Sequence, residues 1–170
     1  LDPVESPEGE VRWELDAATL LGLPDPGRAY ALFEQARSLR DQKKYAEAET
    51  ALREAIRLEP ALLEPALLEA HEMLGWTLQA QGKFPEMEAA FRDLLRLKPD
   101  NAEGQHGVGR ALLHQKKFGD AIAPFREAIR LGSTDHWVYD GLGWALVEQG
   151  QFAEAEAAFG DGSLYLEKAI

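Results

Sequence analysis

Apolar residues recur at three- and four-residue steps from residue 29 onward, which is the spacing of one face of an α-helix. Short polar stretches interrupt these runs: Gln-Lys-Lys at 42–44 and 115–117, and Gln-Gly-Lys at 81–83. Such stretches are typical of tight turns between helices. The pattern therefore predicts pairs of helices, each pair folded into a helical hairpin.

The hairpins repeat with a period of 34 residues. Gly75, Gly109 and Gly143 are spaced by 34 and 34, and the sequences around them align, with a fourth copy centred on Ala36. We predict units at 29–62, 68–101, 102–135 and 136–170, preceded by an arm at 1–28. Each unit pairs a small residue of its first helix with a mostly small residue of its second, so that the helices can cross closely; these packing residues are Ala36, Ala48, Gly75, Met87, Gly109, Ala121, Gly143 and Ala155.

We number the places of each unit from 1 to 34, starting at Ala29, Leu68, Ala102 and His136. The pattern then resembles the tetratricopeptide repeat, which has small residues at places 8 and 20, an aromatic at place 24 and a proline at place 32. Phe91, Phe125 and Phe159 hold place 24, and Pro60 and Pro99 hold place 32. The resemblance implies an all-α fold, a right-handed α-solenoid of antiparallel helical hairpins. Because no single hairpin can bury its own apolar face, neighbouring units stack to make the core.

Three segments depart from the repeat. The arm holds seven acids and two bases, and we expect it to cap the first hairpin or to lie in the protein's own groove. Between the first two units, "EPALL" occurs twice, which we interpret as a five-residue insertion at 63–67 that lengthens a turn or acts as a hinge for swapping. In the last unit, Gly160–Gly162 predicts a break in the second helix, and the segment after it either folds back as a cap or leaves an open end that associates.

The resemblance also implies where a ligand binds. In tetratricopeptide arrays the first helices line a concave face, with places 2, 5, 9, 12 and 13 projecting into it. The groove residues are Tyr30, Phe33, Arg37, Arg40, Trp76, Gln79, His106, Arg110, His114, Trp137, Asp140 and Trp144. Place 9 reads Arg, Trp, Arg, Trp along the stack, which suits a peptide with acidic and apolar anchors. The alternative is that Trp76 and Trp144 pack as core, and that Tyr30 and Phe33 lie beneath the arm.

One known subtype is set aside. Arrays that hold the C-terminal carboxylate of heat-shock chaperones carry lysines, asparagines and an arginine at five places that read Phe33, Arg37, Met73, Glu103 and Gly107 here. This chain therefore lacks the residues with which those arrays bind a carboxylate.

Composition narrows the function further. The net charge of -12 disfavours nucleic acid and anionic lipid as partners. The sequence has no run of 18 apolar residues, so we expect no membrane insertion. The chain has no cysteine, so thiolate chemistry is excluded and the compartment stays open, with the cytoplasm slightly favoured over the periplasm. The chain begins at Leu1 rather than methionine, so we expect a mature product from which any targeting segment is missing.

We expect no catalytic residues, no metal site and no cofactor. His106 and His114 lie eight positions apart, about 12 Å along a helix, which is too far for one metal ion. "GQHGVG" at 104–109 lies within a predicted helix rather than after a strand, so it is not read as a phosphate loop.

The sequence thus predicts a non-catalytic module or adaptor that binds a peptide or protein segment in its groove. A chaperone for secreted or membrane proteins is an alternative, since bacterial type III secretion chaperones are similar in size, acidity and repeat type. The competing class is a self-assembling scaffold, a homo-oligomer joined through the duplicated hinge or the open ends.

Light scattering on a sizing column over a hundredfold concentration range separates these classes. A constant monomer that gains peptide binding when residues 1–28 are removed would indicate a groove guarded by its arm. A larger species that reverts to monomer when one "EPALL" copy is deleted would make the duplication an assembly device.

Overall fold

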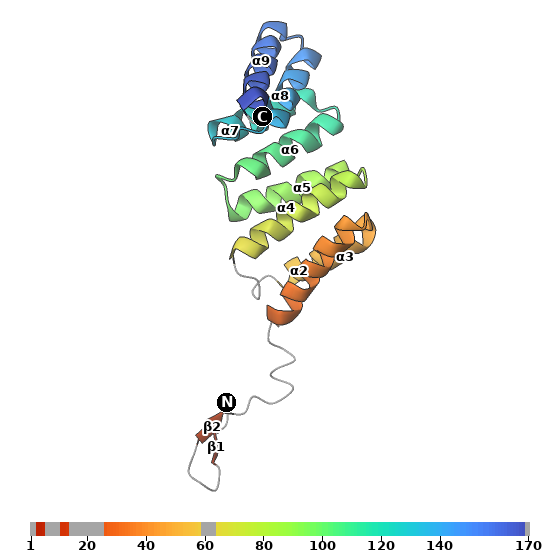
Figure 1. Cartoon of the computed structure of the whole chain (residues 1–170), viewed down its shortest axis with the longest axis vertical. Helices are drawn as coiled ribbons and strands as arrows, with labels where there is room; N and C mark the ends of the chain where they lie inside the picture. Colours follow the sequence, from red (N-terminus) through yellow and green to blue (C-terminus); the bar gives the residue numbers. More distant parts are fainter. Residues whose placement is uncertain (1–2, 6–10, 14–25, 59–63, 169–170) are drawn as a thin grey trace.

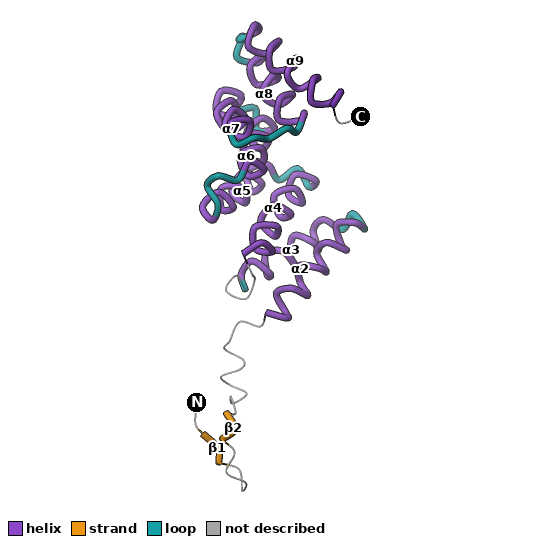
Figure 2. Tube along the Cα trace, turned by 60° about the vertical axis from the view of Figure 1, so that its left-hand side comes forward, coloured by secondary structure: helices purple, strands orange, loops and turns teal. Residues whose placement is uncertain are grey.

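The structure, a computed structural model, describes residues 3–5, 11–13, 26–58 and 64–168. The described residues form eight helices arranged as four antiparallel hairpins (Figure 1). The helices are α2 Pro26–Asp41, α3 Tyr45–Arg57, α4 Glu64–Ala80, α5 Phe84–Leu97, α6 Ala102–His114, α7 Phe118–Arg130, α8 His136–Glu148 and α9 Phe152–Lys168. Figure 2 shows the hairpins following one another along the long axis, each turned relative to the last. The predicted fold class, an α-solenoid of helical hairpins, is confirmed.

The arm contains a feature that sequence reasoning missed. Strands β1 (Pro3–Glu5) and β2 (Val11–Trp13) pair antiparallel, with Pro3 opposite Trp13. Whether the arm caps the first hairpin or lies in the groove stays a prediction, because residues 14–25 are outside the described part of the chain.

The turn inside each hairpin depends on one residue in the left-handed backbone region. Gly82 and Gly150 hold this position with φ of 73° and 74°, and Lys43 and Lys116 hold it with φ of 60° and 61°. Left-handed backbone costs a non-glycine residue about 1–2 kcal/mol, so the two lysine turns depend on the packing of the helices they join.

Two phenylalanine rings form the centre of the stack. Phe91 and Phe125 are 0% and 1% exposed. A Cβ added to Gly75 or to Gly107 would lie 2.4 or 2.3 Å from the Phe91 ring. Each ring therefore lies between a glycine of its own first helix and a glycine of the next unit's first helix.

This geometry corrects one packing prediction. The closest side chain to Gly75, Gly109 and Gly143 is the place-24 phenylalanine, not the place-20 residue that the sequence analysis named. Met87, Ala121 and Ala155 are buried nearby at 0%, 0% and 2% exposure. The aromatic ring is larger and reaches farther across the hairpin, so it makes the contact that requires glycine.

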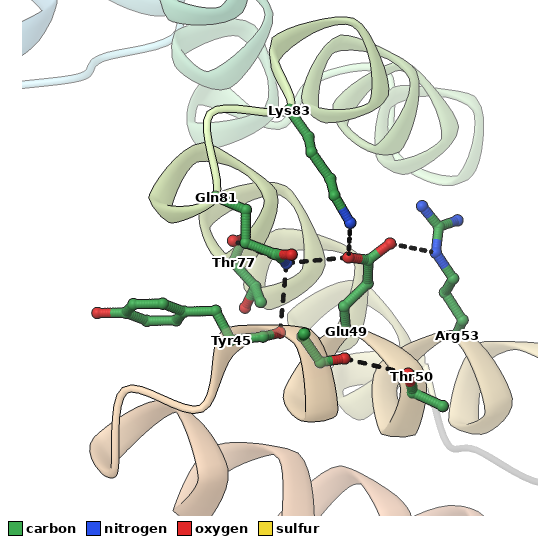
Figure 3. Close-up of polar contacts among 8 residues, drawn as sticks. Tyr45, Glu49, Thr50, Arg53, Thr77, Gln81 and Lys83 are labelled. Carbon is green, nitrogen blue, oxygen red and sulfur yellow. Dashed lines mark hydrogen bonds and ion pairs between the residues drawn. The ribbon is translucent and has the colours of Figure 1, made fainter.

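A repeated set of polar contacts, here called the polar ladder, joins neighbouring units through a glutamate of one unit and a glutamine and lysine of the next. Figure 3 shows the contacts around Glu49. Glu49 accepts hydrogen bonds from Gln81 at 2.9 Å and Lys83 at 2.7 Å, both of the next unit. Gln81 also donates to the Tyr45 carbonyl at 3.3 Å. The pattern recurs 34 to 39 residues later, where Glu88 accepts from Gln115 at 2.8 Å and lies 3.8 Å from the Lys117 ammonium.

The structure places Pro65 of the duplicated segment near the start of a helix, as its sequence predicts. Helix α4 begins at Glu64 and has Pro65 as its second residue, so most of the predicted insertion at 63–67 extends this helix. Proline is compatible with the first helical turn, where its missing N–H would have no partner. The hinge itself falls on residues 59–63, outside the described residues.

The predicted helix break at Gly160–Gly162 is wrong, because α9 continues through it to Lys168. Gly162 is buried, and a Cβ there would lie 2.9 Å from the Tyr139 Cβ. Glycine costs a helix interior about 1 kcal/mol, but here it permits close packing of α9 on α8.

The ladder predicts an acid-sensitive contribution to stability. Burial alone would raise the pKa of Glu49, but hydrogen bonds from Lys83, Arg53 and Gln81 outweigh it, so the pKa lies below its usual value; the pKa of Glu88 is lowered in the same way by Gln115 and Arg92. A lowered folded pKa stabilises the protein above the unfolded pKa, about 4.3, and this contribution is lost as the pH falls through the folded value. We expect Glu49→Gln to lower the free energy of unfolding by about 1 kcal/mol at pH 7 and to have little effect near pH 2. Urea denaturation at both pH values measures this, with the exposed Glu47→Gln as control; an equal loss at both pH values would contradict it.

The glycine contacts predict opposite effects of one substitution at two helical sites. Gly75→Ala places a methyl group 2.4 Å from a fully buried ring, so we expect a loss of about 1–3 kcal/mol. Gly160→Ala has no atom within 4 Å and lies inside α9, so we expect a gain of roughly 0.5–1 kcal/mol. Thermal and urea unfolding of both variants test the pair, and a stable Gly75→Ala would show that Phe91 can move aside.

Candidate functional site: the inner face of the first helices

The first helices of neighbouring units contact one another directly, α4 with α6 and α6 with α8. Elements that approach most closely lie on the inside of a curved stack, so these helices line the concave face. Two recurring contacts between units involve five of the twelve candidate groove residues: Arg37, Trp76, His106, Arg110 and Trp137.

The first contact joins place 9 of one unit to place 2 of the next. The Arg37 guanidinium lies 2.6 Å from Glu69. The Trp76 indole N–H donates to Glu103 at 3.1 Å. At the third junction the Arg110 guanidinium lies over the Trp137 ring, 5.7 Å from its centroid.

The second contact joins place 5 to the residue that caps the next unit's first helix. Asn101 caps α6 through Gly104 N–H and donates its amide to Glu72 at 3.1 Å. Asp135 caps α8 through Trp137 N–H, and its other oxygen lies 3.6 Å from His106 Nδ1. The Asn101 cap thus holds the place-5 side chain of the preceding unit by a hydrogen bond, whereas the Asp135 cap lies beside His106, whose ring nitrogens have no hydrogen-bond partner among the described residues.

These contacts shift the pKa of two carboxyl groups in opposite directions. Burial raises the pKa of Glu72, with the nearby Glu103 and Glu69 adding to it against the Asn101 hydrogen bond. The His106 imidazole and the Trp76 N–H hold the pKa of Glu103 below its usual value despite burial. The groove acids of the second and third units are therefore held in contacts within the protein.

A cavity of about 200 Å³ opens between α6 and α8. Predicted groove residues form most of its wall, and two exposed indoles, Trp137 at 54% and Trp144 at 57%, flank it. The lining is Arg110, Leu113, His114, Phe125, Trp137, Asp140, Gly141 and Trp144. The volume accommodates about one large side chain of a ligand.

Arg110 is held in place by neutral groups. Its guanidinium lies 5.7 Å from the ring centroids of both Trp76 and Trp137. With its amide oxygen turned toward Arg110, Gln79 accepts from Nε at 2.7 Å and from Nη2 at 3.2 Å. Among the described residues, no carboxylate lies within ion-pair distance of Arg110.

His114 adds an aromatic wall rather than a charge. Its ring stacks on Phe84, with centroids 4.5 Å apart and an interplanar angle of 8°. Burial, and secondarily the Arg110 charge, lower the pKa of His114. The imidazole is therefore neutral at pH 7, and Arg110 is the cation of the cavity.

Two predicted groove residues are not available to a ligand. Phe33 is 3% exposed, because it packs in the core with the Arg37 guanidinium 5.0 Å above its ring. His106 is also 3% exposed, with Trp76 and Phe125 rings at 5.3 and 6.4 Å. Both hold place 5, which in these units faces the neighbouring helix instead of solvent.

The other predicted residues divide between closed and open positions. Arg37 is paired with Glu34 and Glu69, so it is not a free anchor for an acidic ligand. Tyr30 and Arg40 are half-buried at the first unit, away from the cavity. Trp76 is half-buried and packs edge-on against Phe91, with ring centroids 4.9 Å apart, as expected if it packs as core. Trp144 is 57% exposed to solvent.

Sequence reasoning missed the floor of the cavity. Phe125 was assigned to packing alone, and Gly141 was not named, yet both line it. A Cβ on Gly141 would lie 2.4 Å from the Phe125 ring, so the two positions are coupled. The glycine at place 6 of the third and fourth units, Gly107 and Gly141, was the available signal.

The described residues contain no group of three or more histidine or acidic side chains placed to hold a metal ion. Within the same residues, none of the helices combines the length and apolar character that crossing a bilayer requires.

Comparisons with known proteins agree with this architecture. Two sequence profiles of the tetratricopeptide repeat match residues 29–62 and 72–136, which together make up more than half of the chain. No curated protein sequence matches the chain. The chain belongs to the tetratricopeptide repeat family.

Solved structures of MamA are similar in fold. MamA 41-end from Desulfovibrio magneticus RS-1 superposes with a TM-score of 0.72 at 16% identity, covering 85% of this chain and 77% of that one. A second structure, described as a crystal structure of MamA, has a TM-score of 0.74 at 19% identity, covering 85% and 82%. At this level of identity the likeness concerns the fold alone.

Proposed function

We propose that the chain is a non-catalytic interaction module that binds a peptide or protein segment in the groove, at its C-terminal half. The observation that carries this proposal is the cavity between α6 and α8, flanked by two indoles that are more than half exposed. Tryptophan and arginine are the residues most enriched at binding hot spots, and here they converge on one concavity.

The contrast within the groove supports the same location. In the first two junctions, groove side chains are held by neighbouring units, as in Arg37–Glu69 and Trp76–Glu103. In the last unit, Trp144 is 57% exposed, and Asp140 makes no ion pair or hydrogen bond with the described residues. They are free to contact a ligand at little cost to the fold.

A self-assembling scaffold is the second candidate, for a specific reason. Phe91 and Phe125 are each covered by a glycine of the next first helix, whereas the glycine against Phe159 is Gly143 of its own unit, and Phe159 is only half-buried. A second copy packed against α9 would cover this ring. Mass that rises with concentration would favour this candidate over peptide capture. The chaperone alternative differs from the module only in its partner, and no feature of the cavity favours it.

The proposal predicts that peptide binding depends on Trp144. Peptides enriched from a random dodecapeptide phage library on the immobilised chain would be labelled and measured by fluorescence anisotropy. We expect Trp144→Ala to weaken binding at least tenfold, because a large exposed ring leaves the cavity wall, with no change in melting temperature.

Phe152→Ala is the matched control, since Phe152 is an aromatic of the same unit, 68% exposed and outside the cavity. Failure to enrich any peptide, or equal losses in the two variants, would contradict binding at this site.

A further inference from the structure

The cavity contains two hydrogen-bond donor groups, the Arg110 guanidinium and the Trp144 indole N–H, that have no carboxylate partner among the described residues. Arg110 has Gln79 oxygen on one edge and indole rings beside its faces, but no carboxylate within ion-pair distance. The Trp144 indole N–H makes no hydrogen bond to any residue that the structure describes. Arginine and indole N–H share one preference, which is an oxygen acceptor.

The protein supplies a template for the Trp144 site two repeats away. Trp76 holds the same place 9, packs edge-on against the place-24 ring Phe91 at 4.9 Å, and donates its N–H to the Glu103 carboxylate at 3.1 Å. Trp144 packs edge-on against its own place-24 ring, Phe159, at 6.0 Å and with an interplanar angle of 81°. Trp144 therefore has the corresponding aromatic partner, and no described side chain accepts from its N–H.

Arg110 is prepared for the same group. Its side chain is already ordered by Gln79 and the two indoles, so little conformational entropy remains to be lost when an anion binds. Guanidinium groups bind carboxylates through charge-assisted hydrogen bonds, which are about twice as strong as neutral ones. No protein carboxylate among the described residues competes for it at ion-pair distance.

The remaining walls define what accompanies the carboxylate. Phe125 and Gly141 make an apolar floor of about one side chain's width between the indoles. Asp140 also lines the cavity, makes no ion pair or hydrogen bond within the described residues, and repels an anion. It suits the backbone N–H groups of a ligand, and it makes recognition of the anion depend on Arg110 and Trp144.

Resting on the proposed function, we propose that the cavity recognises an acidic side chain of the bound segment, with a neighbouring apolar side chain on the Phe125–Gly141 floor. The carboxylate accepts from the Arg110 guanidinium and the Trp144 indole N–H. The partner is thus a segment in which glutamate or aspartate lies next to a large apolar residue.

Three blocked peptides test the charge directly. Acetyl-Gly-Leu-Glu-Glu-Leu-Gly-amide is compared with its Gln-Gln and Lys-Lys counterparts by titration of the nitrogen-15-labelled chain. The chain has four tryptophans, whose indole N–H signals are assigned with single Trp→Phe variants. We expect the glutamate peptide to shift the Trp137 and Trp144 signals and to bind at least tenfold more tightly than the glutamine peptide.

Three conservative variants separate this role from a merely structural one. Arg110→Gln should bring the glutamate and glutamine peptides within about twofold of each other. Trp144→Phe keeps the ring but removes the N–H, so it should narrow the preference without weakening the glutamine peptide. Asp140→Asn removes a repulsive charge and should tighten the glutamate peptide severalfold, a gain that a folding defect cannot produce.

Equal binding of the glutamate and glutamine peptides, or tighter binding of the lysine peptide, would overturn the acidic preference. The acidic preference is also overturned if none of the three peptides shifts the Trp137 and Trp144 signals while library-selected peptides still bind through Trp144. In that case the proposed function stands. If library peptides also fail, the proposed function and this inference fall together.

Discussion

The close approach of an aromatic ring to two glycines sets the spacing on which the rest of the structure depends. Phe91 lies between Gly75 and Gly107, and Phe125 lies between Gly109 and Gly141. A side chain at any of these glycines would overlap the ring, and the rings are too deeply buried to turn away. The contact therefore fixes the distance inside the second and third hairpins and the distance from each to the next, whereas Leu52 and Ala36 hold the ring and glycine positions of the first hairpin.

Once that spacing is fixed, polar side chains on both sides of the core fall into repeated registers. On one side, a glutamate pairs with the glutamine and lysine of the next turn, as at Glu49 and Glu88. On the groove side, helix caps and place-2 residues hold the polar groups of the preceding unit. The Glu72 and Trp76 side chains are thus satisfied by the unit that follows them along the chain, whereas the buried His106 ring nitrogens have no hydrogen-bond partner among the described residues.

The periodic features could be predicted from sequence, and the features that depend on what lies opposite could not. The 34-residue period predicted the hairpins and their turns, because helix amphipathicity and turn residues are local properties. It failed at Gly162, where a buried contact with Tyr139 outweighs the low helix propensity of glycine. For the site, place numbers predicted five of the cavity residues but included Phe33 and His106, since a place number does not reveal which helix covers the side chain.

The same registers explain why the open site lies at the third junction. Place 2 reads Glu69, Glu103 and Trp137 along the junctions, so a tryptophan replaces an acid only where it meets Arg110. An acid there would pair with Arg110 as Glu69 pairs with Arg37, whereas an indole covers a face of the guanidinium and leaves it without a described carboxylate at ion-pair distance. Place 9 of the following unit is Trp144, so the unpaired cation and the unpaired indole N–H line one cavity, and a carboxylate from a partner is the group that both lack.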